Sequence, residues 1–432
     1  MEFIMDMVHH NPGEPPFDTA FLKPEKLTAY GYNAQVFKHI NTAVSFRNFD
    51  PELFEDEPEA AAWIHAAAER IRREEIAPAR AAGLQVYYHI DLFVLPEAMK
   101  KKYAAQICTP DGRISLDREM TLEIHRAMFD ELFRDFDIDG LIIRVGETYL
   151  HDTPYHTGNG AVEYGDREQE IESFAKLLAF LCSEVCEKHG KYLFFRTWDC
   201  FPDRFHADPQ YYLDVTDRIE PHPKLIFSIK HTVLDFWRNV KFNECLTIGH
   251  HRQIIEVQCQ REYEGKGAYP SYVMNGVINS FSENRLPKGL RDIQNHPLIC
   301  GIYTWSRGGG WFGPYIKNEF WCDLNAYVIS GFAKSPDKTE EDLFYQYTKE
   351  VMGLSEEDGR SFRQLCLAAN EAVLHGRYIT AFDRQYEEGI MPCQNWMRDD
   401  RLGGMKQLRP TFVYLYDRDL LDAAVYEKNC PC

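Results

Sequence analysis

Short runs of apolar, β-branched and aromatic residues recur through the first three-quarters of the chain, and amphipathic stretches separate most of them. Alternating strand and helix patterns predict a parallel sheet whose crossover connections are helices. Eight such runs suit a closed (β/α)8 barrel. The predicted strands are Phe3–Val8, Ala34–His39, Leu84–Ile90, Gly140–Val145, Tyr192–Thr197, Leu225–Lys230, Ile254–Cys259 and Gly301–Trp305.

The stretches between these strands carry helical patterns. Between the fourth and fifth strands, apolar residues from Ile171 to Val185 recur three or four positions apart, and Gly190 can terminate the helix. The segment Ser115–Phe136 has a similar pattern, and Pro51–Gly83, rich in Ala, Glu and Arg, predicts a surface helix.

Beyond the eighth strand, only helical signals are convincing. Thr339 with Asp342, and Ser355 with Asp358, resemble N-terminal helix caps with an acidic third position. We therefore predict an α/β protein in two parts. Residues 1–319 form the (β/α)8 TIM barrel, and residues 320–432 form a helical C-terminal extension.

The formal net charge of −19 argues against a broad surface for nucleic acid or anionic membranes, because such surfaces need clustered Lys and Arg. An acidic substrate would need a local basic pocket instead. No apolar run approaches ~20 residues, so no transmembrane helix is predicted, and the first residues lack a signal-peptide pattern. We expect a cytoplasmic protein, with secretion or the periplasm as alternatives if the N-terminus was trimmed.

Twelve cysteines without a Cys-x-x-Cys pair indicate scattered, mostly buried thiols of a reducing compartment. Cys182 and Cys186 fall one helical turn apart, and Cys430 and Cys432 lie in the terminal tail. Packing within the protein explains the first pair, and a position in the terminal tail explains the second. No further ligands stand at the spacing of a zinc site. We therefore predict neither a metal nor a cofactor.

Ionisable residues follow four of the predicted strands, at the strand ends where TIM barrels place catalytic groups. Glycoside hydrolysis needs two carboxyl functions, one protonated to assist the leaving group and one ionised. Glu147, Asp235 and Glu262, after the fourth, sixth and seventh strands, are the catalytic candidates. Structural ion pairs at the barrel rim are the alternative interpretation.

Three cations share the same predicted rim. Arg144, Arg196 and Lys230 exceed what counterions alone require, and they suit a substrate carboxylate. Trp198 and Trp305 are candidates to pack against sugar rings, although packing within the core or rim explains them equally well.

Several of these segments resemble the catalytic barrel of the family 67 α-glucuronidases. The resemblance runs, with gaps, from about Gly31 to Pro336. Its general part consists of Gly31–Val36, Gly83–Tyr87, Asp139–Ile143 leading to Glu147, and Arg196. Its more specific part consists of Ile229-Lys-x-x-x-x-Asp-Phe236 and Glu256-Val-Gln-x-x-x-Glu-Tyr263, where both spacing and strand position agree.

This resemblance implies an enzyme that removes glucuronic or 4-O-methylglucuronic acid from xylan-derived oligosaccharides with inversion. Carried over to this chain, Glu147 is the general acid. Asp235 and Glu262 are the pair that activates water, and Arg196 and Lys230 bind the substrate carboxylate. An oligosaccharide that carries a uronic acid is the implied partner.

The chain also departs from that family. Arg144 stands near the position of a family lysine, but at a different distance from the acid. The first strand begins at Phe3, without a counterpart of the family's N-terminal accessory domain, and the segments His9–Glu14 and Thr148–Gly160 differ. Because such loops shape the sugar subsites, the resemblance supports the mechanism more firmly than the substrate.

Two other classes of function stay open. His9, His10, His89, Asp91 and His231 lie near strand ends and suggest a metal-dependent barrel hydrolase, although adjacent His9 and His10 would point to opposite faces of a strand. The other class is a barrel that binds carbohydrate without catalysis. The C-terminal helices are expected to mediate a homodimer, as they do in the resembled family.

Overall fold

Eight parallel strands close into a barrel, in the spatial order β1-β10-β9-β8-β7-β5-β3-β2. The computed structural model describes residues 1–8, 18–148, 150, 153–160, 165–199, 204–233, 236, 241–259, 271–281, 288–307, 319–377 and 417. All eight predicted strands are present, and their ends differ from the predictions by at most two residues. They are β1 Phe3–Val8, β2 Ala34–Lys38, β3 Gln85–Asp91, β5 Gly140–Arg144, β7 Tyr192–Arg196, β8 Leu225–Lys230, β9 Arg252–Gln258 and β10 Ile299–Arg307.

Side chains that alternate along each strand fill two separate cores. Inward residues, among them Phe3, Tyr87 and Phe194, pack within the barrel. Edge-to-face contacts order this layer, with ring centroids 5.2 Å apart for both Phe3–Phe194 and Tyr87–Phe194. Outward residues such as Leu193 and Phe195 join the larger core beneath the helices.

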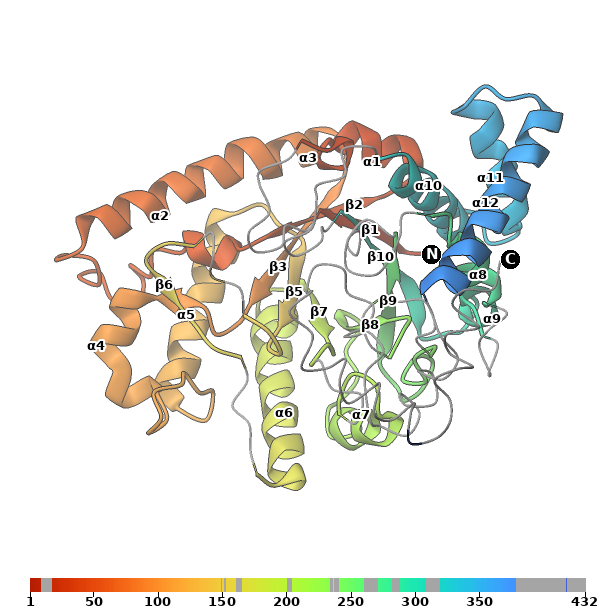
Figure 1. Cartoon of the computed structure of the whole chain (residues 1–432). Coiled ribbons are helices and arrows are strands. Elements are labelled where there is room, and N and C mark those ends of the chain that lie inside the picture. The colour runs from red at the N-terminus through yellow and green to blue at the C-terminus, as the bar shows by residue number, and fades with distance from the viewer. Residues whose placement is uncertain are drawn as a thin grey trace.

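Helices surround the strands and cover this outer core (Figure 1). Two of them contain a π-helical turn: α2 passes through η3 into α3, and α6 passes into η4. The helical elements are η1 Ala20–Leu22, α1 Pro24–Tyr30, η2 Ile40–Ala43, α2 Pro58–Arg70, η3 Ile71–Ile76, α3 Ala77–Ala81, α4 Glu97–Ile107, α5 Glu119–Asp135, α6 Arg167–Leu181, η4 Cys182–Lys188, α7 Pro209–Thr216, α8 Met274–Asn279, α9 Leu290–Ile293, α10 Phe320–Lys334, α11 Glu340–Glu350 and α12 Glu356–Arg377.

Local signals place the ends of several helices where the sequence predicts them. Gly190 follows η4 in the left-handed region, with φ of 64°. Thr339 and Asp342 form the predicted capping box of α11. At the start of α12, the hydroxyl of Ser355 accepts from the backbone N–H of Asp358 at 3.2 Å.

The C-terminal helices begin on the barrel itself. Helix α10 packs against β10 and β1 in the position of an eighth outer helix, and the amino group of Met1 donates to the carbonyl of Ala333 over 3.0 Å. Helices α11 and α12 follow beyond it (Figure 1). The division at residues 319 and 320, and dimerisation through these helices, stay predictions.

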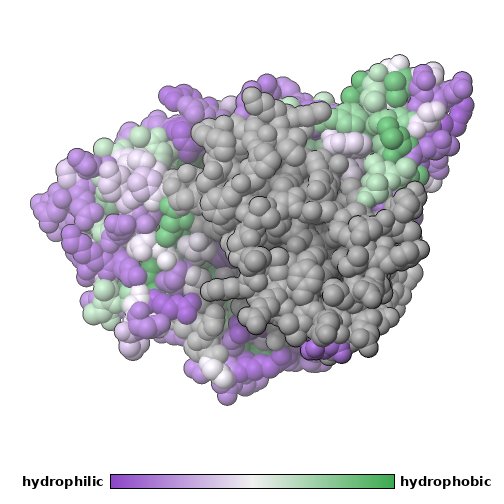
Figure 2. Space-filling view, viewed as in Figure 1, coloured by the Kyte–Doolittle hydropathy of each residue, from purple (hydrophilic) through white to green (hydrophobic). Residues whose placement is uncertain are grey.

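The outer surface is polar on the side of α2 and α4, where hydrophilic residues dominate the view in Figure 2. Within the described residues, no helix is long and apolar enough to cross a membrane. A short antiparallel pair, β4 Leu95–Pro96 with β6 His156–Thr157, holds part of the segment after β5 against the segment after β3. No sequence pattern indicated this pair.

Candidate active site

The described candidate residues come from the carboxyl ends of neighbouring strands. Arg144 ends β5 and leads to Glu147, Arg196 ends β7 and leads to Trp198, and Lys230 ends β8. Trp305 lies near the end of β10, the strand that pairs with β9 on one side and with β1 on the other. Asp235 and Glu262 lie outside the described residues, so their positions stay predictions.

Glu147 is held at the barrel mouth by two donors. Arg144 donates from Nη1 to Oε2 of Glu147 over 3.3 Å, and the indole Nε1 of Trp198 donates to the same oxygen over 3.0 Å. The Glu147 side chain keeps 31% of its surface exposed, whereas that of Arg144 keeps 3%. Glu147 is therefore oriented by buried neighbours and still accessible to a ligand.

Arg144 has a second acidic partner from the adjacent strand. Its Nε donates to Oδ1 of Asp91 over 2.7 Å, and its Nη2 lies 2.6 Å from the same oxygen. The Asp91 side chain is only 2% exposed, so this carboxylate is a buried counterion. Asp91 thus positions the arginine that positions Glu147.

Lys230 lies among aromatic rings beside this acid. Its ammonium nitrogen is 3.5 Å from the ring centroid of Trp198 and 5.8 Å from that of Trp305. Phe236 contributes a third ring at 5.2 Å. A cation over indole faces is stabilised by their negative quadrupole. The contacts therefore join Glu147, Trp198, Lys230 and Trp305 into one continuous group.

Arg196 has a buried acidic partner, Glu256, that is not among the predicted site residues. Its Nε and Nη2 donate to the two carboxylate oxygens of Glu256 over 2.7 and 2.8 Å, and neither side chain is exposed. Although burial opposes the charge, Glu256 raises the pKa of Arg196 above its usual value. The guanidinium also lies 4.6 Å from the ring of Trp305.

The hydroxyl of Ser228 completes the surroundings of Glu256. It donates to Oε1 of Glu256 over 2.9 Å. Nη1 of Arg196, in contrast, is buried without a hydrogen-bond partner among the described residues. The alternative interpretation of the rim as structural ion pairs therefore applies well to Arg196 and Glu256. An arginine that ends a barrel strand and faces inward needs an acidic counterion. This requirement is the sequence signal that points to an inward-facing acid on a nearby strand.

The residues suggested for a metal-dependent hydrolase do not assemble into a ligand group in the described part of the chain. Asp91 is engaged by Arg144. His231 stacks on Phe236, and burial together with Lys230 lowers its pKa to about 3. His9 and His10 lie outside the described residues.

Comparison with known proteins gives structural likenesses alone. No protein-family model matches the chain, and no curated protein sequence matches it. Among solved structures, an O-GlcNAc hydrolase of Thermobaculum terrenum has a TM-score of 0.45 and 11% identity, covering 98% of this chain and 73% of that chain. A GH20 exo-β-N-acetylglucosaminidase of Vibrio harveyi has a TM-score of 0.41 and 12% identity, and the match covers 79% of this chain and 56% of that chain.

A D-psicose 3-epimerase is also similar, with a TM-score of 0.39 and 11% identity over 76% of this chain and 98% of that chain. Likenesses at these TM-scores and identities do not assign a family or a reaction to the chain.

Proposed function

We propose that this chain is an inverting glycoside hydrolase that removes a uronic acid from an oligosaccharide. The observation that carries the proposal is the continuous group of Glu147, Trp198, Lys230 and Trp305 at the barrel mouth. It combines an accessible carboxyl group with an ammonium group and two indole rings. These groups suit acid catalysis on a negatively charged sugar.

In the proposed mechanism, Glu147 protonates the glycosidic oxygen as the bond to the sugar breaks. Asp235, Glu262 or both deprotonate a water molecule on the opposite face of the sugar ring. Inversion needs room for that water, so the acid and base carboxyl groups must lie roughly 6.5 to 9.5 Å apart. The role of the base pair rests on the family resemblance.

The substrate carboxylate is assigned first to Lys230. Arg196 already binds Glu256 through two nitrogens, so Nη1 is the nitrogen that it would offer to the substrate carboxylate. Its guanidinium also packs against the ring of Trp305 and helps to hold that side chain. Arg144 has a positioning role because it joins Asp91 to Glu147. Charge-assisted hydrogen bonds from such cations would favour a uronate over a neutral hexose.

The substrate class and stereochemistry are tested by incubating the protein with a panel of uronic-acid oligosaccharides, with matched neutral oligosaccharides as controls. NMR follows the anomer that is released first. We expect a free uronic acid whose first anomer is inverted. First release of the retained anomer would refute inversion, and release of neutral sugars alone would refute the uronate assignment.

Replacing Glu147 tests the acid directly. We expect Glu147→Gln to lower kcat/KM by about 10²- to 10⁴-fold on natural oligosaccharides. Aryl glycosides whose leaving groups need little protonation should lose much less activity. The matched control is Glu172→Gln, at a 56% exposed glutamate of α6, and it should leave kcat/KM unchanged.

An equal loss on both substrate types would contradict the role of Glu147 as the acid. Oligosaccharide binding without turnover, unaffected by Glu147→Gln, would instead favour a carbohydrate-binding barrel without catalysis.

Replacing Lys230 tests recognition of the carboxylate. We expect Lys230→Met to lower kcat/KM for the uronide by about 10- to 100-fold, because a charge-assisted hydrogen bond is lost. The methyl ester of the same substrate should be affected much less. Equal losses on acid and ester would show that Lys230 does not read the carboxylate.

A further inference from the structure

A cluster of metal-binding side chains lies away from the candidate active site. Cys182 and Cys186 belong to η4, which precedes β7, and His222 belongs to the connection that precedes β8. Because β7 and β8 are parallel neighbours, these two connections meet at the amino-terminal end of the barrel. Lys230 is the last of the six residues of β8, at the opposite end of a strand that spans about 20 Å.

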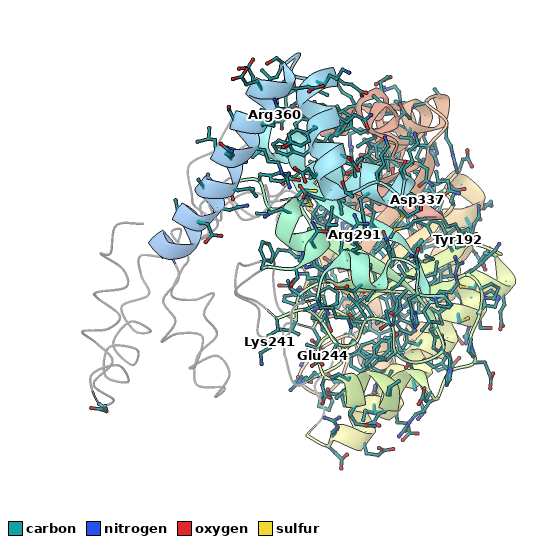
Figure 3. All side chains as sticks on the ribbon, turned by 90° about the vertical axis from the view of Figure 1, so that its right-hand side faces the viewer. Tyr192, Lys241, Glu244, Arg291, Asp337 and Arg360 are labelled. Atoms are coloured by element: carbon teal, nitrogen blue, oxygen red, sulfur yellow. The ribbon has the colours of Figure 1, made fainter. Side chains whose placement is uncertain are left out.

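The two ends of the barrel can be located in Figure 3. Tyr192, the first residue of β7, lies on the right of this view, whereas Lys241 and Glu244, which follow β8, lie on the left. The cysteine and histidine residues precede β7 and β8, so they belong to the end marked by Tyr192. The cluster is therefore separate from the site of the proposed hydrolysis, and the inference below does not depend on that proposal.

The three side chains offer their ligand atoms to a common point. The Sγ atoms of Cys182 and Cys186 and one ring nitrogen of His222 all lie within 4.8 Å of one another. Both thiols are unoxidised and buried, and His222 is partly exposed.

We propose that Cys182, Cys186 and His222 bind a thiophilic divalent metal ion, Zn²⁺ in the first instance. Two thiolates and an imidazole are ligands that Zn²⁺ prefers, and the thiolates neutralise its charge in a buried site. Tetrahedral coordination with Zn–S bonds of about 2.3 Å places the sulfurs ~3.8 Å apart. The observed limit of 4.8 Å therefore requires the two sulfurs to move together by ~1 Å at most.

Metal binding would change one hydrogen bond in a predictable way. The backbone N–H of Lys224 donates to Nδ1 of His222 over 3.1 Å. An ion bound at Nδ1 would replace this donor, whereas an ion bound at Nε2 would move the ring proton to Nδ1. In both cases the Lys224 N–H loses its acceptor. Water would take the fourth position, reached past the partly exposed His222.

Cobalt provides the first test, because thiolate-bound Co²⁺ has an intense sulfur-to-metal charge-transfer absorption. The reduced full-length protein is titrated with Co²⁺, and then with Zn²⁺ as competitor. We expect one equivalent to bind with this absorption, Zn²⁺ to displace it, and the Lys224 amide signal to shift in NMR spectra. Binding of less than about a tenth of an equivalent at micromolar free metal would overturn the proposal.

Variants separate this site from adventitious binding. Cys182→Ser and Cys186→Ser should each weaken zinc binding by at least about 100-fold, and His222→Gln by about 10-fold or more. The controls are Cys108→Ser, at another buried free cysteine, and His250→Gln, at an exposed histidine; both should bind zinc normally.

Circular dichroism checks that each variant folds, and the wild-type cobalt spectrum stands even if one variant does not. Zinc binding that is unchanged in the cysteine variants would overturn the proposal. So would a disulfide between Cys182 and Cys186 that persists in reductant.

Discussion

Burial distinguishes the carboxylates at the described barrel mouth. Asp91 and Glu256 are almost fully buried. Two nitrogens of Arg144 contact the Asp91 carboxylate, and two nitrogens of Arg196 contact the Glu256 carboxylate. Glu147 receives donors from Arg144 and Trp198 but keeps 31% of its side chain exposed. The first two carboxylates are therefore counterions, and Glu147 is the one of these three that a ligand can reach.

Loss of a buried counterion should destabilise the fold. We expect Glu256→Gln to lower the free energy of unfolding by about 3–5 kcal/mol, because it leaves the Arg196 charge buried without an anion. Urea unfolding measures the change. Glu172→Gln, at an exposed pair with Lys176, should cost less than about 0.5 kcal/mol. Similar losses in both variants would contradict the structural role of the Arg196–Glu256 pair.

At the residue scale, the sequence predicted which strand ends carry ionisable groups, but not how those groups pair. Arg196 and Glu256 are 60 positions apart, and Arg144 and Asp91 are 53 apart. Hydrogen-bond partners at such separations depend on strand neighbours and register. The sequence pattern therefore predicts Arg196 as a ligand for substrate, whereas in the structure two of its nitrogens donate to Glu256.

At the scale of elements, closure of the barrel depends on a close approach between its first and last strands. Phe3 of β1 pairs with Gly301 of β10. A Cβ atom at Gly301 would lie 2.2 Å from the carbonyl oxygen of Phe3. Only glycine permits this approach, because backbone atoms cannot yield as a flexible side chain can.

Gly301→Ala should therefore strain the β1–β10 seam. We expect the free energy of unfolding to fall by about 2–3 kcal/mol, the cost of overpacking a tight site. Gly165→Ala is the control, because a Cβ there meets no atom within 4 Å and its backbone is not in the left-handed region. The two variants are compared by thermal and urea unfolding, and equal stabilities would contradict the argument.

The period of apolar residues predicted the elements of the barrel well, because that signal is local. It placed the eight barrel strands, though not the short pair β4 and β6, and it predicted the helical segments now seen as α5, α6 and α2 through α3. It did not reveal the π-helical turns η3 and η4, since one turn of six or seven residues contains too few apolar positions to distinguish the two helix types.

At the scale of the whole molecule, the dependence of stability on pH should reflect Asp6. This carboxyl group is buried and accepts hydrogen bonds from Thr304 at 2.6 Å and Ser306 at 2.7 Å. Burial is the main cause that raises its pKa from 3.8 to about 7. The folded state therefore keeps a proton that the unfolded state releases between these two pH values.

This contribution favours folding at low pH and is lost as pH rises from about 4 to about 7. The shift corresponds to about 4 kcal/mol. We expect Asp6→Asn to remove this slope, so the stability of the variant relative to wild type increases with pH. Urea unfolding between pH 4 and 8 measures it, and parallel curves would contradict the assignment.

Buried histidines act in the opposite direction. Burial lowers the pKa of His125, His156, His231 and His251, so the folded state takes up their protons less readily than the unfolded state. Their contribution to stability is lost as pH falls below about 6.5. The difference between wild type and Asp6→Asn isolates Asp6 because both proteins contain these histidines.

The amino-acid sequence by itself determined the eight barrel strands, several of the helices around them and the strand ends at which acids and cations stand. These features follow from hydrophobic periodicity and capping, which act over a few neighbouring residues. Tertiary structure alone decided that Glu256 neutralises Arg196, that Asp91 supports Arg144, and that His222 joins Cys182 and Cys186. Those groupings arise because parallel strands from distant parts of the chain become neighbours when the barrel closes.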